Sequence, residues 1–232
     1  NKMTIQLSDK YPKIIRDLFL YDTVDTPVPA NTPNYESLVC SHFGFMEIML
    51  PFKVQHEDLL EEALKLNWKD KDGKYIWVFG QNKPLEEKLT TGMGFDYDTE
   101  YKSEFKLEPE SIPHFTQFYN ALNEICPITD LTLKRIKPGG YLTPHVDPFA
   151  NPFKIYLALS WPKGSYFKMY KKGFIPLEPG RCFWVNVGDH SHAVVNDSKE
   201  DRIIISLYAD WHTPAWRDIV EHSYKEYHTI PQ

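Results

Sequence analysis

This 232-residue chain has few cysteines, no long apolar run and no excess of basic residues. Its three cysteines, Cys40, Cys126 and Cys182, have no metal-type spacing, and an odd number cannot pair completely within one chain. No window approaches the roughly 20 apolar residues of a membrane span. The opening stretch NKMTIQLSDKYPK has no apolar secretory region. We therefore expect a reduced, cytoplasmic protein that does not act at a membrane.

The charge balance disfavours one further class of partner. The chain has 26 Lys and Arg against 32 Asp and Glu, for a formal net charge of -6. Nucleic-acid-binding domains usually present a basic surface, so we expect no nucleic-acid partner. Its content of 42% hydrophobic and 15% aromatic residues predicts a folded domain with a substantial core. Because no internal repeat divides the sequence, we expect one domain over residues 1–232.

Helical signals are concentrated in the first half of the chain. Proline and threonine make residues 23–33 a predicted loop, and the leucine spacing in 56–68 predicts an amphipathic helix. A second helix is predicted over 111–127, with Ser111 as N-cap and Pro113 in its first turn. The apolar residues of this second helix that we expect to be buried are Phe115, Phe118, Leu122 and Ile125.

After Pro127 the sequence changes to short segments rich in β-branched and aromatic residues, separated by turn signals that contain proline and glycine. The predicted strands lie within 129–137, 154–161, 165–172, 181–187 and 202–211. Short strands at this even spacing favour a β-sandwich or barrel. We expect residues 128–211 to form the β core, with 1–127 as a helical or mixed support region and 212–232 as a C-terminal extension.

The segment PHVDP, residues 144–148, raises the first question of function. Its two prolines disfavour helix, and residues two apart on extended chain point to the same side. His145 and Asp147 would then present an imidazole and a carboxylate to one point. This pattern alone fits half of a metal site or an ordinary polar loop.

A third metal ligand is available in NVGDHSHAVVN, residues 186–196. Both His190 and His192 qualify, because they lie two residues apart on the same predicted face. Two histidines and one carboxylate are typical of non-haem Fe(II) oxygenases, in which other coordination positions stay open. Zinc accepts the same ligand types, so the pattern alone does not identify the metal.

Arg202 follows His192 by ten residues and begins an apolar segment. The guanidinium of an arginine that lies in such a strand is suited to bidentate binding of a carboxylate. 2-Oxoglutarate has a chelating 2-oxo acid at one end and a carboxylate at the other. The alternative is a surface arginine paired with Glu200 or Asp201, but entry into an apolar strand favours a buried partner.

These residues together resemble the signature of the 2-oxoglutarate/Fe(II)-dependent oxygenases. Within that superfamily, HAVVN at 192–196 is similar to the His-x-Val-x-Asn element of the aspartyl/asparaginyl β-hydroxylase group, which includes bacterial proline hydroxylases. LKRIKPGGYLTPHVD at 133–147 is similar to the approach of that group to its first ligand. The resemblance covers about residues 130–210.

The resemblance implies a mainly β fold, a double-stranded β-helix (a cupin-like jelly roll) with packing α-helices. It implies that the catalytic residues His145, Asp147 and His192 hold Fe(II), and that Arg202 binds the distal carboxylate of 2-oxoglutarate.

The same resemblance points to a basic residue and a hydrogen-bonding ring on the strand after the first ligand. Those places are taken here by Lys154 and Tyr156, which are further candidates for binding 2-oxoglutarate. Lysine departs from the more usual arginine of the group.

The implied activity is that of an oxidoreductase, a hydroxylase that couples decarboxylation of 2-oxoglutarate by dioxygen to hydroxylation of a C–H bond. Its substrate would be an amino acid, either free as a small molecule or within a peptide. Two alternatives stay open: a non-catalytic cupin-like protein that binds a metal or ligand, and a nucleic-acid demethylase that uses the same chemistry.

Overall fold

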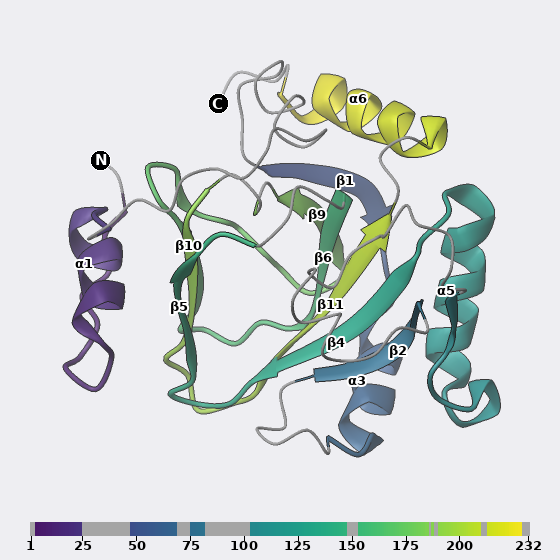
Figure 1. Ribbon diagram of the computed structural model, residues 1–232, viewed down its shortest axis with the longest axis horizontal. Coiled ribbons are helices and arrows are strands. Elements are labelled where there is room, and N and C mark those ends of the chain that lie inside the picture. The colour runs from purple at the N-terminus through teal and green to yellow at the C-terminus, as the bar shows by residue number, and fades with distance from the viewer. Residues whose placement is uncertain are drawn as a thin grey trace.

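Two antiparallel β-sheets form the framework of the protein in a computed structural model (Figure 1). The structure describes residues 3–24, 47–68, 75–81, 103–147, 153–185, 187, 190–209 and 213–228. The predicted loop at 23–33 lies, from residue 25 onward, outside these described residues.

The larger sheet has seven strands in the order β1-β9-β6-β11-β4-β2-β3. In that order the strands are β1 Glu47–Lys53, β9 Arg181–Val185, β6 Phe153–Ser160, β11 Arg202–Ala209, β4 Asp130–Ile136, β2 Tyr75–Gln81 and β3 Ser103–Phe105. The smaller sheet has four strands in the order β5-β10-β7-β8. These are β5 Tyr141–His145, β10 His192–Asn196, β7 Ser165–Met169 and β8 Gly173–Phe174.

Strand β11 shows how the larger sheet separates two cores. Its residues Ile203, Ile205 and Leu207 belong to the apolar cluster beneath the helices, whereas Ile204 belongs to the cluster that lies between the sheets. Because side chains alternate along a strand, Arg202 shares the inner face with Ile204. Both faces of β11 are covered, so the whole strand is buried. A continuous apolar run is the sequence pattern of such a strand.

Helices cover the outer faces of both sheets (Figure 1). α3 His56–Lys65, α5 Pro113–Ile125 and α6 Pro214–His228 place buried residues in the core of the larger sheet. α1 Lys13–Tyr21 packs on the other side, where Ile15, Leu18 and Phe19 meet residues of β10. No helix in the described ranges is both long and apolar enough to cross a membrane.

The predicted fold class is confirmed: the protein is mainly β, a jelly-roll double-stranded β-helix with packing helices. All five predicted strand segments contain a strand, and both predicted helices form. The helix predicted over 56–68 ends earlier, at Lys65, where Leu66 becomes extended and the Trp68 indole donates to the Ala63 carbonyl at 3.1 Å. β1, β2 and β3 come from before residue 127 and extend the larger sheet.

Two details predicted for the second helix are wrong. Ser111 is not the N-cap, because it lies in a preceding 3-10 turn, Pro109–Ser111. The carboxylate of Glu62 on α3 instead accepts hydrogen bonds from the backbone N–H groups of His114 and Phe115, at 3.1 and 2.9 Å. Ile125 is 60% exposed rather than buried, since it lies in the last turn before the helix ends.

This capping contact between helices predicts a stability effect. Glu62→Ala leaves two N–H groups at a partly buried helix end without partners, which should lower the free energy of unfolding by about 1–2 kcal/mol. Urea denaturation measures the change. The matched control is Glu61→Ala, which removes an exposed carboxylate paired with Lys65 at 2.6 Å on the same helix and should change stability little. Equal losses in the two variants would contradict this role of Glu62.

Candidate metal centre

Pairing of β5 with β10 brings the two predicted histidine ligands together. His145 ends β5, His192 begins β10, and the antiparallel register places them opposite each other. Their ring centroids are 4.3 Å apart. Strand pairing thus brings His145 and His192, which are 47 positions apart in the sequence, into direct contact.

Asp147 completes the cluster from just beyond the end of β5. Its backbone N–H donates to the Val187 carbonyl at 2.9 Å, which fixes the chain as it leaves the strand. Its Oδ1 atom lies 3.4 Å from His145 Nε2 and 3.3 Å from His192 Nε2. The ligand atoms of the three residues all lie within 4.8 Å of one another, a grouping that can hold one metal ion.

Backbone carbonyls orient both imidazoles. His145 Nδ1 donates to the Thr143 carbonyl at 2.6 Å, and His192 Nδ1 donates to the His190 carbonyl at 3.0 Å. A neutral imidazole that donates from Nδ1 has its lone pair on Nε2, the atom that faces Asp147 here. His190 lies outside the three-residue cluster and contributes its carbonyl to it.

Burial and a lysine set the charge of the cluster. Burial alone would raise the pKa of Asp147, but the ammonium of Lys154 and the two adjacent imidazoles hold that pKa well below its usual range. Lys154 forms an ion pair with Asp147 Oδ2. Burial is also the main reason that the pKa of His192 is lowered. The cluster therefore offers one carboxylate and neutral imidazole at His192, which is what metal ligation requires.

Arg202 is a buried cation on the inner face of β11, where only 2% of its surface is exposed. Its guanidinium lies over the Trp161 ring, 4.7 Å from the centroid, and its Nε has no hydrogen-bond partner in the part of the chain that the structure describes. Burial lowers the pKa of Arg202 to about 10, so it stays charged at neutral pH. Asp201, one of the alternative partners, instead lies 3.8 Å from Arg135.

Lys154 and Tyr156 lie on the inner face of β6. The Lys154 ammonium is 5.3 Å from the Tyr156 ring centroid and 5.4 Å from that of Tyr208 on β11. Burial raises the pKa of both phenols, to about 12 for Tyr208. Both tyrosines therefore keep their proton at neutral pH and can donate a hydrogen bond.

Several polar residues of this interior were not singled out from the sequence. Thr132 and Ser206 face each other across β4 and β11, and their hydroxyl oxygens are buried without a hydrogen-bond partner among the described residues. Lys134, two residues along β4, lines a cavity of about 320 Å³ together with Tyr75 and Arg202. Thr132 and Lys134 alternate along the sequence with Leu131 and Leu133, which are apolar residues of the strand. This alternation was the one sequence signal that could have indicated that Thr132 and Lys134 face the interior between the sheets.

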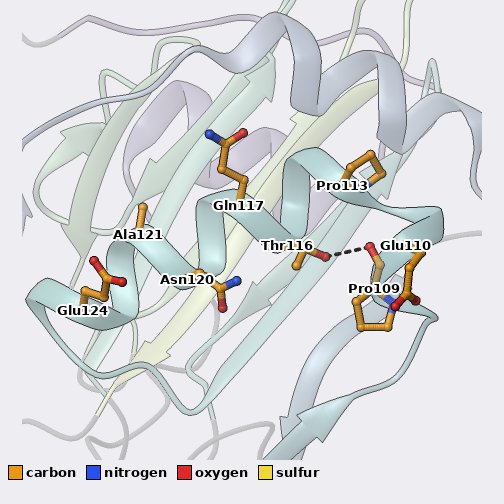
Figure 2. Close-up of a pocket in the computed structure, with 8 residues that line it drawn as sticks. All are labelled: Pro109, Glu110, Pro113, Thr116, Gln117, Asn120, Ala121 and Glu124. Atoms are coloured by element: carbon orange, nitrogen blue, oxygen red, sulfur yellow. Dashed lines mark hydrogen bonds between the residues drawn. The ribbon is translucent and has the colours of Figure 1, made fainter.

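A second hollow lies on the outer side of the fold, against α5 (Figure 2). Its lining comes only from the 3-10 turn and from one face of α5, including Thr116, Asn120 and Glu124. The Thr116 hydroxyl is satisfied by the Pro109 carbonyl at 2.9 Å. This surface contains none of the three clustered side chains, so the His145, Asp147 and His192 cluster is the stronger candidate site.

The ligand types fit a ferrous ion, and the surroundings fit an acidic co-substrate. Two imidazole nitrogens and one carboxylate oxygen are the donor set of non-haem iron oxygenases. The buried guanidinium of Arg202, with an unsatisfied donor, fits a carboxylate ligand.

Comparison with solved structures finds similar proteins at low sequence identity. An oxidoreductase of the 2OG-Fe(II) oxygenase family from Burkholderia pseudomallei is 13% identical, covering 79% of this chain and 94% of that one, with a TM-score of 0.48. A viral collagen prolyl hydroxylase from Paramecium Bursaria Chlorella virus-1 is 16% identical over 73% of this chain and 97% of that one, with a TM-score of 0.41. A Pseudomonas putida prolyl-4-hydroxylase is 14% identical over 80% and 96%, with a TM-score of 0.39.

No curated protein sequence matches this chain. The model of one protein family, Aspartyl/Asparaginyl beta-hydroxylase, matches residues 61–213. This range is about two thirds of the chain and contains His145, Asp147, His192 and Arg202. The protein therefore belongs to the aspartyl/asparaginyl β-hydroxylase family and, with it, to the dioxygenases that depend on Fe(II) and 2-oxoglutarate.

Proposed function

We propose that this protein hydroxylates a C–H bond of an amino acid, either free or within a peptide, at a ferrous ion held by His145, Asp147 and His192. The observation that carries the proposal is the convergence of His145 Nε2, His192 Nε2 and Asp147 Oδ1 from two separate segments. A buried arginine on the inner face of the facing sheet supplies the cation that an acidic co-substrate needs.

The bound ion and 2-oxoglutarate supply the oxidation: one atom of dioxygen goes to the substrate C–H bond, and the other goes to succinate as carbon dioxide leaves. The protein holds and orients these groups. Asp147 provides the one negative charge among the three ligands, and its ion pair with Lys154 fixes the carboxylate in one orientation. Supporting contacts of this kind commonly hold metal ligands in place.

Arg202 would bind the distal carboxylate of 2-oxoglutarate, and Lys154 and Tyr156 would contact its metal-proximal end. Their places support this division, because Lys154 contacts the ligand Asp147 whereas Arg202 lies at the other end of β11. The Tyr156 phenol keeps its proton and can donate to a carboxylate oxygen.

The substrate would approach from the side of His145. The side chain of His145 is 38% exposed, whereas that of His192 is 3% exposed and packs against Phe167, with ring centroids 5.4 Å apart. Apolar residues around His192 keep water from that side of the centre. The activity assay described below distinguishes a free amino acid from a peptidyl one as the substrate. The organisation of the chain as a single domain and its cytoplasmic location remain predictions.

The ligand assignment predicts different effects for neighbouring histidines. His192→Ala removes a ligand and should weaken Co(II) binding by more than the roughly 10–100-fold that loss of a supporting contact costs. His190→Ala keeps the backbone carbonyl that orients His192, so the affinity of this variant for Co(II) should change much less. Titration calorimetry measures both, with circular dichroism as the control for folding. Strong loss in His190→Ala with little change in His192→Ala would contradict the assignment.

The activity itself is tested by incubating the Fe(II)-loaded protein with 2-oxoglutarate, dioxygen and pools of amino acids and peptides. Mass spectrometry should detect one substrate with an added oxygen atom, together with an equal amount of succinate. His192→Ala should form neither product. Asp147→Gly, which opens a coordination position, should lose or divert hydroxylation. A protein that binds Fe(II) and 2-oxoglutarate but never forms succinate would instead be a binding protein.

A further inference from the structure

Strand β5 forms one edge of the smaller sheet, and among the described strands it pairs with β10 alone. The Gly140 carbonyl, just before β5, accepts a hydrogen bond from the Asn196 N–H at 2.9 Å, so the chain at Gly140 faces β10. Backbone groups alternate in direction along a strand, so those of Tyr141 and Thr143 face away from β10. A sheet edge of this kind is a template for pairing with another extended chain.

This edge leads directly to the candidate metal centre. β5 begins at Tyr141 and ends at His145, whose side chain is 38% exposed. Tyr141 is 40% exposed, and Thr143 is exposed as well. A chain that pairs along β5 would therefore bring one of its residues beside His145, on the side from which the substrate is proposed to approach. A free amino acid is too short to use the rest of the edge.

The larger sheet extends past this edge and provides a floor for such a chain. β4 lies across from β5, because Ile136 of β4 and Leu142 of β5 pack in the same apolar cluster between the sheets. β2 follows β4 in the sheet, and its Tyr75 and Trp77 share the inner face, since Ile76 between them belongs to the cluster beneath the helices. Both rings are half-buried, with centroids 6.2 Å apart. Aromatic rings of this kind suit contact with the side chains of a peptide.

The space between the edge and this floor is basic. A cavity of about 320 Å³ lies there, lined by Tyr141 and its neighbours in β5 and by Tyr75 of β2. Its lining also includes four cations and no carboxylate, and the cations are Lys134, Arg135, Lys137 and Arg202. Arg202 is assigned to the co-substrate in the proposed function, whereas Lys137 is exposed at the start of β5. An acidic side chain on a docked peptide would complement this charge.

We propose that the substrate is an extended peptide that pairs with the edge of β5, with its oxidised residue beside His145 and an acidic residue near Lys137. The inference rests on the proposed function and names its substrate class. Tyr141 is four positions from His145, and Lys137 lies beyond Tyr141 in the turn. At about 3.3 Å per residue, the acidic residue would be roughly four to six positions from the oxidised one. In this mode of recognition backbone hydrogen bonds supply affinity, and side-chain contacts supply specificity.

The first test uses the Fe(II)-loaded full-length protein with 2-oxoglutarate and dioxygen. It compares the free amino acids with pools of random peptides that are long enough to span β5 on either side of the oxidised residue. Tandem mass spectrometry identifies each oxidised residue and its flanking residues, and succinate is measured in every reaction. We expect peptides to be oxidised about tenfold faster or more than any free amino acid, as for two added hydrogen bonds. Asp or Glu should be enriched at the predicted distance.

The second test places single N-methyl groups along the backbone of the peptide that is oxidised fastest. Alternate amides of a paired strand face its partner, and the others face away. Methylation of an amide that faces β5 removes a hydrogen-bond donor and should raise KM by about tenfold. Methylation of the amides between them should change KM much less, so the effect should alternate along the peptide.

The third test reverses one charge at each edge of the smaller sheet. Lys137→Glu should shift the enrichment at the predicted distance from acidic to basic residues. The matched control is Lys172→Glu, an exposed lysine in the turn between β7 and β8 at the opposite edge, which should leave the preference unchanged. Circular dichroism confirms that both variants are folded.

The outcomes separate three claims. Oxidation of free amino acids alone, or an effect of N-methylation that does not alternate, would overturn the pairing with β5 and leave the proposed function standing. Peptide oxidation without acidic enrichment, or with an enrichment that Lys137→Glu does not change, would overturn the role of Lys137. If no amino acid or peptide is oxidised and no succinate forms, the proposed function itself is wrong.

Discussion

The pairing of β5 with β10 is the constraint on which the proposed metal centre depends. It places His145 opposite His192, and pairing of β10 with β7 holds the second strand from its other side. The buried amide of Asn196 fixes the end of β10 by donating to the Ile136 and Glu200 carbonyls, each at 2.8 Å. Because a shift of one residue would turn every side chain to the opposite face, this register decides whether the ligands meet at all.

The two faces of the larger sheet differ: the outer face packs against helices, and the inner face lines the interior that contains the candidate site. The outer face packs Leu131, Leu133, Ile205 and their neighbours against α3, α5 and α6 in the largest apolar cluster of the described residues. Burial of that surface contributes the main share of stability. The inner face can therefore contain lysine, arginine, tyrosine and hydroxyl groups that a purely structural core would exclude. Charge inside the barrel is tolerated because apolar packing outside it stabilises the same strands.

Much of this protein was predictable from its sequence, because strands and ligand motifs are local patterns. The turn signals and the residues rich in β-branched and aromatic side chains after Pro127 predicted the strand segments. The spacing of PHVDP, His192 and Arg202 predicted the candidate site. Contacts between distant segments were not predictable in the same way. The capping of α5 by Glu62 and the orientation of His192 by the His190 carbonyl depend on tertiary geometry.

The central claim is that one ferrous ion and one 2-oxo diacid bind together at His145, Asp147 and His192. Anaerobic titration followed by visible absorption tests it most directly, because a 2-oxo acid chelated to Fe(II) gives a charge-transfer band that neither component gives alone. The account predicts a saturable band at one equivalent of Fe(II) that requires 2-oxoglutarate and disappears in His192→Ala. Absence of the band with Fe(II) and 2-oxoglutarate both bound, or its full retention in His192→Ala, would contradict the account.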